Sequence, residues 1–331
     1  MRPRFTFRPL TRGDLPLLHE WLNRPHVAEW WEDDKSLEHV ERSHGADLES
    51  NVIWQFLACL DGVPVGYVQS YRVLGADPDW WQDETDPGAR GVDQFLAHAE
   101  QLGRGLGSQM VRQFVAGLFA DPEVSKVQTD PAPSNGRAVR AYEKAGFRPV
   151  RELETPDGPA LLMLVTRSEW QADLQGAKRE TYRALRERLA SLLADEDDLI
   201  AAQATIACEL HHAFDTFDWT GFYRTRGPDL LVIGPYQGTH GCLRIPFSRG
   251  VCGAAARTRT TQRVPDVSKF EGHIACSGNT QSEIVVPVVT AAGAVLGVLD
   301  VDSNTPDAFS ELDQAELEAI CADLARRFPN G

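Results

Sequence analysis

A charged, helix-forming run divides this 331-residue chain into two parts. Residues 168–196 are rich in Arg, Glu, Ala and Leu, and Gly176 is the one glycine that interrupts the run before residue 193. A chain of this length accommodates two domains of ordinary size. We therefore predict a first domain over residues 1–167 and a second over 197–331. The charged run is then either a helical linker or the first helix of the second domain.

Hydrophobic periodicity predicts strands mixed with helices in the first part. We expect strands near residues 53–60, 64–71, 91–97 and 126–129, and helices at 15–23, 106–119 and 135–145. The turn Pro156-Asp157-Gly158 between two strand-like runs predicts a closing hairpin. The first part is thus an α/β domain that ends near Arg167.

The second part has the same mixed character. We expect helices at 199–214, after residue 250 and at 312–327, with strands at 219–224, 230–236, 283–290 and 294–302. This pattern predicts a separate α+β domain.

Charge and cysteine content exclude several classes of function. The chain has 33 basic and 48 acidic residues, a formal net charge of −15, so nucleic acid is a poor partner and cationic ligands are favoured. Its longest apolar runs, such as residues 284–289, are too short to cross a bilayer, and no signal peptide is recognised. Six cysteines without metal-binding spacing indicate reactive thiols. We expect a cytoplasmic protein that binds no membrane and no metal.

A glycine-rich turn precedes the predicted helix at 106–119. Such a turn lets backbone N–H groups approach a pyrophosphate at the positive end of a helix. It also occurs in dinucleotide sites and in tightly packed turns. The candidate phosphate-binding residues are Gly103, Arg104, Gly105, Gly107 and Ser108.

The segment from Asn135 to Phe147 places Tyr142 two helical turns beyond Asn135. With it, the first part resembles the aminoglycoside 6′-N-acetyltransferases of the GNAT family, whose fold has a mixed sheet. The resemblance covers residues 10–167. It rests on Glu20-Trp21-Leu22-Asn23, Trp30-Trp31, Gly66 to Tyr71, Trp80-Trp81, Glu84 to Gly88, Gly91 to Gln94 and Gln128 to Pro131.

This resemblance implies direct transfer of an acetyl group from acetyl-CoA to an amine, which must lose a proton while the CoA thiolate gains one. Asp93, expected at the end of the central strand, is the candidate that orients the ammonium group and accepts its proton. Tyr142 is the candidate acid for the thiolate, and Asn135 a candidate cofactor contact. Leu102 departs from the family, which usually has Gln or Arg at that place.

The acceptor is expected to be cationic. Acidic residues surround Trp80 and Trp81 in the loop from 75 to 91, a composition suited to polycationic sugars with apolar ring faces. Asp83 and Asp130 are further candidate substrate contacts. A hydroxylated lysine or another cationic metabolite is the alternative acceptor, and a solvated acidic loop is the alternative reading of 75–91.

Three cysteines in the second part lie beside Gly or Ser in turn-like sequence. They are Cys242, Cys252 and Cys276, within Gly238 to Cys242, Arg249 to Gly253 and His273 to Thr280. Structural cysteines are usually buried in apolar runs, as around Cys208 and Cys321. The contrast favours reactivity for the three.

With Trp219 to Tyr223, Pro235 to Gly238, Pro265 to Val267 and Ser282 to Pro287, residues 175–328 resemble the free methionine-(R)-sulfoxide reductases, which have a GAF fold with an antiparallel sheet. The resemblance implies that Cys276 attacks the sulfoxide sulfur and becomes a sulfenic acid. A second thiol then forms a disulfide. We expect Cys242 in that role, with Cys252 as the alternative. Recycling implies a thioredoxin-type dithiol partner.

The sulfoxide oxygen must be protonated to leave as water. This calls for a carboxylic acid whose pKa is raised in a dry pocket, and Glu283, Asp300 and Asp302 are the candidates. Asp300 and Asp302 alternate by two in a strand and would face the same side. Trp219 and Tyr223 are expected either to form an aromatic wall for the substrate methyl group or to belong to the core.

Two other functions stay open at this point. The GAF domain could be a ligand sensor without catalysis that regulates the acetyltransferase, or the acetyltransferase part could be an inactive scaffold. A homodimer through the GAF domain is also open.

Overall fold

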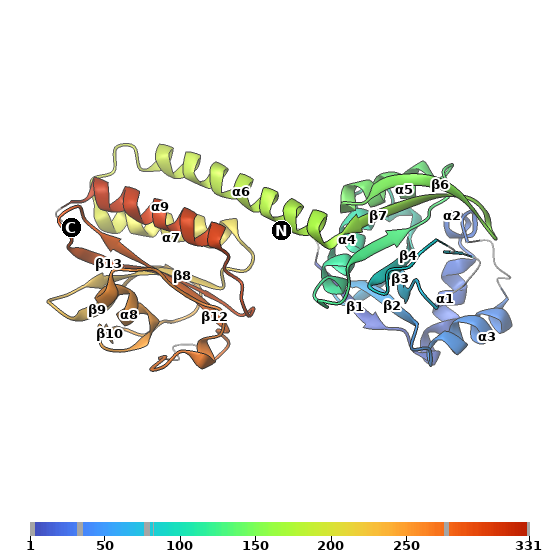
Figure 1. Cartoon of the computed structure of the whole chain (residues 1–331), viewed down its shortest axis with the longest axis horizontal. Coiled ribbons are helices and arrows are strands. Elements are labelled where there is room, and N and C mark those ends of the chain that lie inside the picture. Colours follow the sequence, from blue (N-terminus) through green and yellow to red (C-terminus); the bar gives the residue numbers. More distant parts are fainter. Residues whose placement is uncertain (1–3, 32–35, 76–79, 82, 275–277, 330–331) are drawn as a thin grey trace. The chain divides into compact units, whose positions relative to one another are not determined.

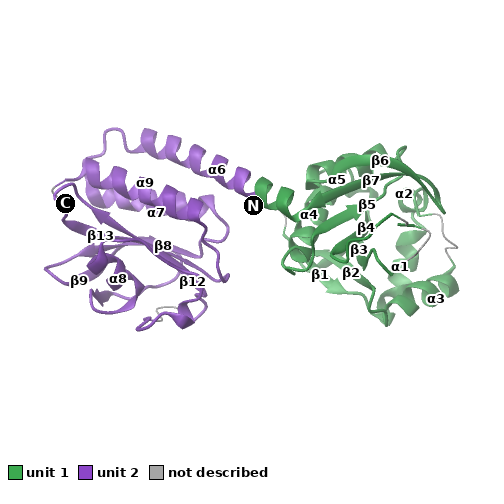
Figure 2. Cartoon of the chain, in the orientation of Figure 1, with its two compact units in different colours: residues 1–173 green, residues 174–331 purple. Residues whose placement is uncertain are grey.

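The computed structural model describes residues 4–31, 36–75, 80–81, 83–274 and 278–329. The chain divides into two compact units, residues 1–173 and 174–331 (Figure 2). Each unit has its own sheet and its own hydrophobic core. The boundary between the units lies inside the charged helical run, slightly beyond the predicted end of the first domain.

The first unit is a seven-stranded sheet with helices (Figure 1). Its strands are β1 (Phe5–Pro9), β2 (Ile53–Leu60), β3 (Val63–Arg72), β4 (Ala89–Leu96), β5 (Lys126–Thr129), β6 (Arg148–Thr155) and β7 (Gly158–Thr166). Its helices are α1 (Leu15–Leu22), α2 (Pro25–Ala28), α3 (Leu37–Asp47), α4 (Leu106–Leu118) and α5 (Gly136–Ala145), with short 3-10 turns at Arg12–Asp14 and Ala99–Gln101. The sheet order is β1-β2-β3-β4-β5-β7-β6.

Only the β4–β5 pair is parallel among the pairings of this sheet. The predicted mixed sheet is therefore confirmed. β4 and β5 are joined through α4, whose apolar side chains Met110, Val111, Phe114 and Val115 are buried. Because a parallel pair needs such a crossover, the start of α4 lies next to the end of β4.

Helix α6 (Arg167–Leu192) is the charged run, and its 26 residues pack in both units. Trp170 lies in the core of the first unit, where its ring is 5.7 Å from that of Phe119. Tyr182, Leu185 and Leu189 lie in the core of the second unit. About the first two turns of the helix, up to Asp173, are thus part of the first unit, and the remainder serves as the first helix of the second.

The second unit is a six-stranded antiparallel sheet in the order β10-β9-β8-β13-β12-β11. Its strands are β8 (Trp219–Thr225), β9 (Leu230–Gln237), β10 (Arg244–Pro246), β11 (Gln262–Val264), β12 (Ser282–Val289) and β13 (Val295–Ser303). Its own helices are α7 (Leu199–Ala213), α8 (Gly250–Thr258) and α9 (Glu311–Arg327), with a 3-10 turn at Val267–Lys269. The predicted antiparallel sheet flanked by helices is confirmed.

Side-chain alternation separates the two faces of this sheet. Ile284, Val286 and Val301 join the core under α7 and α9, whereas Val285 and Val298 join the cluster that holds α8 on the opposite face (Figure 1). Because successive side chains of a strand point to opposite faces, Glu283, Asp300 and Asp302 belong to the α8 face. The alternation of side chains along β12 and β13 therefore determines which polar groups face α8.

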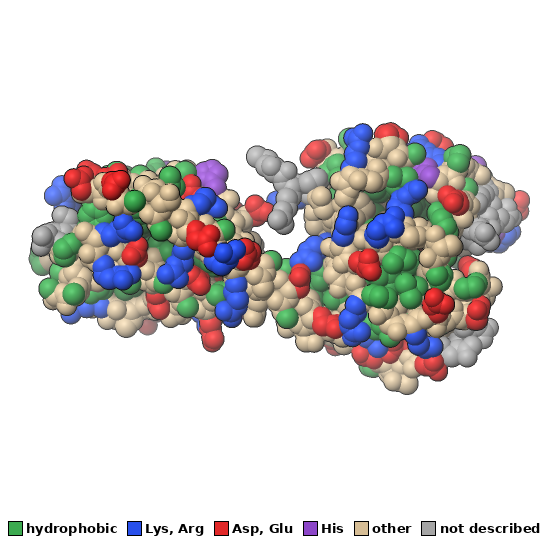
Figure 3. All heavy atoms as spheres, turned by 90° about the horizontal axis from the view of Figure 1, so that it is seen from above, with side chains coloured by type: hydrophobic (Ala, Val, Ile, Leu, Met, Phe, Trp, Pro, Cys, Tyr) green, Lys and Arg blue, Asp and Glu red, His purple; other side chains and the backbone are tan. Residues whose placement is uncertain are grey.

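The described residues form no helix that is both long and apolar enough to cross a membrane. Basic and acidic side chains are interspersed over both units on the face drawn in Figure 3. That face therefore offers no broad positive surface of the kind that nucleic acid requires.

Candidate active sites

Asp93 lies in the interior of β4, which continues to Leu96. The prediction that Asp93 ends the central strand is therefore wrong. Its neighbour across the strand pair is Gln69, whose Nε2 donates to Asp93 Oδ2 at 2.8 Å. This donor allows a carboxylate to stand inside a strand, because a buried charge needs a hydrogen-bond partner.

Burial first, and the nearby Asp130 carboxylate second, raise the pKa of Asp93 against the opposing hydrogen bond from Gln69, and the result is a pKa of about 7. A carboxylate with a pKa near neutrality is a stronger base than an ordinary aspartate and is still largely ionised above pH 7. These are the properties required of a group that takes a proton from an ammonium ion.

Asp130 follows β5 directly, as predicted, and accepts a hydrogen bond of 2.6 Å from Trp80 Nε1. Burial raises the pKa of Asp130, and the bond from Trp80 opposes the rise. Trp80 is half-buried, so its indole holds one oxygen of Asp130 while part of the ring stays accessible. The structure brings Asp93, Asp130 and Trp80 together on one side of the sheet, as the electrostatic coupling of the two carboxylates indicates.

Tyr142 on α5 is buried, and its ring packs edge-on against Phe147 at 5.4 Å. Burial first, and the Asp93 carboxylate second, raise the pKa of its hydroxyl above the ordinary value. The phenol therefore stays protonated near neutral pH. A raised pKa also makes it a weaker acid, so its role as the acid for the CoA thiolate stays a prediction.

The glycine-rich turn forms an open backbone surface at the start of α4. Gly103 and Gly105 have φ of +73° and +79°, in the left-handed region that favours glycine, and a Cβ atom on Gly103 would meet nothing within 4 Å. Gly105 is the N-cap of α4 and offers no side chain to its first N–H groups. Those groups can therefore bind an anion.

Two buried amide oxygens beside this turn, Gln101 Oε1 and Gln109 Oε1, have no hydrogen-bond partner among the described residues. Ser108 Oγ donates to the Gly105 carbonyl at 2.9 Å and braces the turn. Leu102 packs in an apolar cluster with Leu106, which accounts for a leucine at this place. The open turn and the orphaned amides fit a phosphorylated cofactor whose chain carries N–H groups.

Asn135 and the aromatic loop have structural tasks. Asn135 Oδ1 caps α5 by accepting from Ala138 N at 3.0 Å. Trp81 is buried beside Tyr71, and Asp83 is largely exposed and pairs with Arg151 at 2.8 Å. These contacts leave the predicted cofactor and substrate roles of Asn135, Trp81 and Asp83 as predictions.

A chain of buried polar side chains, not anticipated from the sequence, continues from Gln69 away from Asp93. Tyr67 Oη lies 2.7 Å from Gln69 Oε1 and 2.7 Å from Gln55 Oε1. Gln55 Oε1 also lies 2.6 Å from His44 Nδ1, and Gln55 Nε2 donates to the His44 carbonyl at 2.9 Å. The available signal was a glutamine, Gln55, inside the otherwise apolar strand β2, and a second glutamine, Gln69, inside β3.

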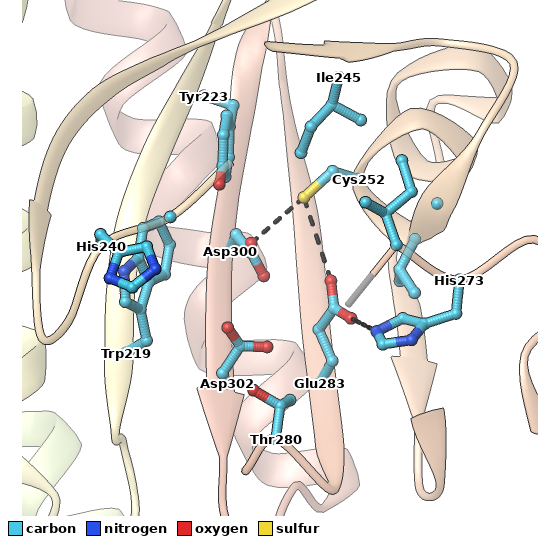
Figure 4. A pocket seen from close by; sticks show the side chains of 14 residues that line it. Trp219, Tyr223, His240, Ile245, Cys252, His273, Thr280, Glu283, Asp300 and Asp302 are labelled. Carbon is cyan, nitrogen blue, oxygen red and sulfur yellow. Dashed lines mark hydrogen bonds and ion pairs between the residues drawn. The ribbon is translucent and has the colours of Figure 1, made fainter. Parts of the chain in front are cut away.

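The second unit has a pocket on the α8 face of its sheet (Figure 4). Glu283 lies opposite Asp302 across β12 and β13, and Asp302 lies opposite Trp219 across β13 and β8. The three predicted acids thus line one pocket with both predicted aromatic residues. The remaining lining residues are His240, Gly241, Ile245, Gly250, Val251, Cys252, His273, Ile274 and Thr280.

Cys252 enters this pocket from α8 and is buried. Its Sγ lies 3.2 Å from Asp300 Oδ2 and 4.0 Å from Glu283 Oε1 (Figure 4). Burial first, and then the Asp300 and Glu283 carboxyl groups, raise the pKa of the Cys252 thiol well above its ordinary value. Cys252 is therefore a neutral hydrogen-bond donor to Asp300 and a poor nucleophile.

Burial raises the pKa of Glu283 and of Asp302 well above ordinary values, and the Asp300 charge raises both further. Burial raises the pKa of Asp300 to about 6, and hydrogen bonds from Cys252 and Glu283 limit the rise. The pocket therefore favours the protonated forms of Glu283 and Asp302 beside an Asp300 that ionises more readily. Asp300 Oδ1 is buried and has no partner among the described residues, so it is available to a donor group of a ligand.

Of the remaining reactive candidates, Cys242 is disulfide-bonded. Cys276 lies outside the described residues, so its predicted role stays a prediction. The described free thiols are Cys59, Cys208, Cys252 and Cys321. Cys252 thus retains its thiol in a state in which Cys242 has already been oxidised.

The aromatic wall is a stack of three rings. Trp219 lies between Tyr223, at 5.8 Å, and Tyr236, at 5.4 Å, and its Nε1 donates to the Thr239 carbonyl at 2.9 Å. Gly241 lies against this stack, where a Cβ atom would come within 2.9 Å of Tyr223 Oη. Trp219 and Tyr223 are both buried and both line the pocket. They therefore belong to the core and also form an aromatic wall of the pocket, so the two alternatives left by the sequence are compatible.

Sequence reasoning missed His273, whose Nε2 lies 3.8 Å from Glu283 Oε2. Burial lowers the pKa of His273, so the ring is neutral near pH 7. Cys252, Glu283 and Asp300 each bring one ligand atom to within 4.8 Å of the others, close enough for a metal ion. Protonated acids and thiols are poor metal ligands. The expectation of a site without metal remains a prediction.

Comparison with known proteins assigns each unit separately. Residues 11–155 match the acetyltransferase (GNAT) domain family, and residues 194–327 match the GAF domain family. Over 147 residues the chain is 41% identical to a free methionine-R-sulfoxide reductase of Saccharomyces cerevisiae, covering 40% of this chain and 82% of that protein.

The first unit has relatives of higher identity. Over 170 residues it is 49% identical to an aminoglycoside N(6′)-acetyltransferase type 1 of Klebsiella pneumoniae, covering 50% of this chain and 85% of that protein. A crystal structure of the aminoglycoside acetyltransferase AAC(6′)-Ib with coenzyme A is 49% identical, with a TM-score of 0.50, and covers 51% of this chain and 98% of that one. Both resemblances seen in the sequence are confirmed.

Proposed function

Because the chain belongs to the GNAT acetyltransferases through its first domain and to the GAF-domain free methionine-R-sulfoxide reductases through its second, we propose that it is a bifunctional enzyme. The first domain transfers an acetyl group from acetyl-CoA to the 6′-amine of an aminoglycoside. The second reduces free methionine-(R)-sulfoxide to methionine. The observation that carries the proposal is that each domain brings buried carboxyl groups together beside the side chains that its reaction uses: Asp93 beside Gln69 in the first domain, and Glu283, Asp300 and Asp302 in one pocket of the second.

In the acetyltransferase site, the turn at Gly103 and Gly105 and the N-terminus of α4 would hold the pyrophosphate of acetyl-CoA. Acetyl-CoA supplies the activated acetyl group. Asp93 orients the acceptor ammonium group and takes its proton, so that the neutral amine can attack the acetyl carbonyl. Tyr142, which keeps its proton in the buried site, protonates the departing thiolate.

Asp130 and the acidic charge of the chain favour a polycationic acceptor. Aminoglycosides carry several ammonium groups on apolar sugar rings, and Trp80 presents an aromatic surface next to Asp130. The names of the relatives support the 6′-amine as the acceptor.

The acetyltransferase assay follows CoA release with kanamycin. We expect turnover with kanamycin and none with an aminoglycoside that has a hydroxyl group at the 6′ position. Asp93→Asn should lower kcat/KM by about 10²- to 10⁴-fold, the usual effect of losing a general base. The matched control Asp121→Asn changes an exposed carboxylate outside the site and should leave the rate unchanged. Full activity of Asp93→Asn would contradict the assignment.

In the reductase site, the Cys276 thiolate attacks the sulfoxide sulfur while Glu283 or Asp302 protonates the oxygen. The sulfoxide gains two electrons and becomes methionine, and the cysteine becomes a sulfenic acid. Cys242 then attacks the sulfenic sulfur, releasing water and forming a disulfide. An external dithiol of the thioredoxin type reduces the disulfide and completes the cycle.

The substrate's ammonium group can bind the unpartnered Asp300 Oδ1, and its methyl group can rest on the Trp219 and Tyr223 rings. A pocket that binds the α-ammonium group selects a free amino acid over a methionine inside a protein, because a peptide nitrogen is uncharged.

The reductase assay supplies dithiothreitol and measures methionine. We expect product from free methionine-(R)-sulfoxide and none from the S epimer. Cys276→Ser should abolish product, whereas Cys208→Ser, which changes a free thiol on α7, should not. If wild-type protein binds methionine sulfoxide without reducing it, and the ligand changes the acetyltransfer rate, the domain is a sensor and the reductase proposal is wrong.

A further inference from the structure

A row of polar side chains crosses three strands of the first domain. Gln55 on β2 lies opposite Gln69 on β3, and Gln69 lies opposite Asp93 on β4. Tyr67, two residues before Gln69 on the same strand, points to the same face because side chains alternate. Four hydrogen-bond contacts of 2.6–2.8 Å join these groups to one another and to His44 on α3.

We propose that Tyr67 and Gln55 act as positioning residues that bias Asp93 toward its protonated form, so that Asp93 accepts the proton of the acceptor amine. This inference rests on the proposed role of Asp93. It follows from counting the hydrogen atoms available along the row in each state of Asp93.

The end of the row at Gln55 has a fixed orientation. Gln55 Nε2 donates to the buried carbonyl of His44 at 2.9 Å, so Gln55 Oε1 must face Tyr67 Oη. Turning this amide around would place two carbonyl oxygens against each other. Tyr67 therefore always faces an acceptor on this side.

When Asp93 is ionised, the row has one hydrogen atom too few. Gln69 must then direct Nε2 to the Asp93 carboxylate, and its Oε1 faces Tyr67 Oη at 2.7 Å. A phenol has a single hydrogen atom, yet Tyr67 now meets two carbonyl oxygens at the same distance. One oxygen pair is left in contact without a hydrogen atom between the two atoms.

When Asp93 is protonated, the shortage disappears. The Gln69 amide can turn by half a rotation, because the positions of its oxygen and nitrogen are set by the hydrogen-bond network. Asp93 then donates to Gln69 Oε1, Gln69 Nε2 donates to Tyr67 Oη, and Tyr67 donates to Gln55 Oε1. With the His44 tautomer that carries its hydrogen atom on Nδ1, every contact contains a hydrogen atom, so the row stabilises the state that follows proton transfer.

Other titratable groups face Asp93. Asp130 after β5 raises the pKa of Asp93, and the Asp93 charge in turn raises the pKa of Tyr142 on α5, of Tyr71 on β3 and of Tyr67, so these phenols are neutral near pH 7. On α3, Asp47 interacts with Tyr67 and with His44. None of these groups is changed by a substitution at Gln55.

The test is the pH dependence of kcat/KM for CoA release with kanamycin, measured on the full-length protein. Tyr67→Phe removes the hydroxyl that meets two acceptors, and Gln55→Leu removes one of the acceptors. Each variant should shift the acid limb of the profile to lower pH by about one unit. The reason is that the free-energy cost of one unsatisfied hydrogen-bond contact corresponds to a pKa shift of roughly one unit. The double variant should shift it no further, because both changes relieve the same contact.

Tyr71→Phe is the matched control. It removes an equally buried phenol from the same strand, near the same carboxylate, without touching the row, and should leave the limb in place. The acceptor's own amine titrates identically in all variants, so differences between profiles report on the protein. A purely structural role would lower the rate at every pH with no displacement of the limb.

The inference would be overturned if Tyr67→Phe and Gln55→Leu both kept the acid limb of kcat/KM at the wild-type pH. It would also be overturned if the two shifts added up in the double variant. Should Gln55→Leu fail to fold, Tyr67→Phe alone still tests the displacement. Failure of the inference is distinct from failure of the proposed function. A fully active Asp93→Asn variant would remove the role of Asp93 as the base. If Asp93→Asn is inactive but Tyr67→Phe and Gln55→Leu leave the acid limb unmoved, only the role of the row is removed.

Discussion

Replacing Cys252 by alanine separates the two thiols that could resolve the sulfenic acid of the reductase. We expect Cys252→Ala to turn over repeatedly and Cys242→Ala to stop after one methionine per enzyme. The reason is that Cys252 is a buried neutral thiol held by Asp300, whereas Cys242 is the disulfide-bonded cysteine. A thiol with a raised pKa attacks a sulfenic acid slowly.

The size of the Cys252→Ala effect follows from its contact with Asp300. A hydrogen bond to a charged group is worth about 1.5–3 kcal/mol, and a thiol is a weak donor, so about 1.4 kcal/mol, or one pH unit, is expected. The pKa of Asp300 would then rise from about 6 to about 7. Its ionised fraction would fall roughly twofold at pH 7 and about fivefold at pH 6.

If the Asp300 carboxylate binds the substrate's ammonium group, kcat/KM should fall by these factors and recover at higher pH. The assay measures methionine formed with and without a thioredoxin-type protein dithiol, because dithiothreitol would also reduce the sulfenic acid of Cys242→Ala directly. Free thiols are counted by alkylation and mass spectrometry after one turnover. Wild type and Cys252→Ala should each lose two thiols per enzyme. Cys242→Ala should instead yield a sulfenic acid that dimedone traps.

The opposite pattern would refute this reasoning. If Cys252→Ala stopped after one methionine and accumulated sulfenic acid while Cys242→Ala turned over, Cys252 would be the resolving thiol. Its buried contact with Asp300 would then have to break during catalysis. A loss of kcat/KM that did not recover at higher pH would separately exclude the effect on Asp300.

Three further results are expected. Glu283→Gln keeps the shape of the side chain but removes its acidic proton, and should lower reductase kcat/KM by about 10²-fold or more if Glu283 is the principal acid; Asp302→Asn, tested in parallel, should then have the smaller effect. Gly105→Val forces a β-branched residue to φ +79°, which costs about 1–3 kcal/mol, and should raise KM for acetyl-CoA without affecting methionine formation. Asp313→Ala leaves Lys178 without its partner at 2.6 Å and should destabilise the second domain by about 3–5 kcal/mol in chemical unfolding monitored within that domain.

The reductase site could be predicted largely because its acids obey strand geometry. Asp300 and Asp302 alternate by two, and Glu283 opens the neighbouring strand, so one hairpin brings all three to one face. The protonation state of Cys252 could not be predicted in this way. It depends on α8 packing against the far face of a sheet, and that contact joins residues 48 positions apart.

The acetyltransferase site was predicted less completely, because a polar residue in an apolar run can lie either inside a strand or at its end. Asp93 within an apolar run resembles a strand end, and the sequence alone does not show that Gln69 lies opposite it with a donor. Tyr67 and Gln55 were overlooked for the same reason. Their contacts depend on how β2, β3 and β4 are paired. The alternation of apolar and polar residues along one strand does not show which residue of the next strand lies opposite.

The two proposed mechanisms require the same kind of group in opposite protonation states. Asp93 must be ionised to accept a proton, and the donors from Gln69 and, on Asp130, from Trp80 keep ionisation possible near pH 7. Glu283 and Asp302 must be protonated to donate one, and burial first, then the adjacent Asp300 charge, raises the pKa of both. As pH rises through about 7 the first reaction therefore gains, because its base ionises. The second should decline only at higher pH, where its acids lose their protons. Both activities should then coexist just above neutral pH, and profiles of the two rates measured on one preparation will locate that range.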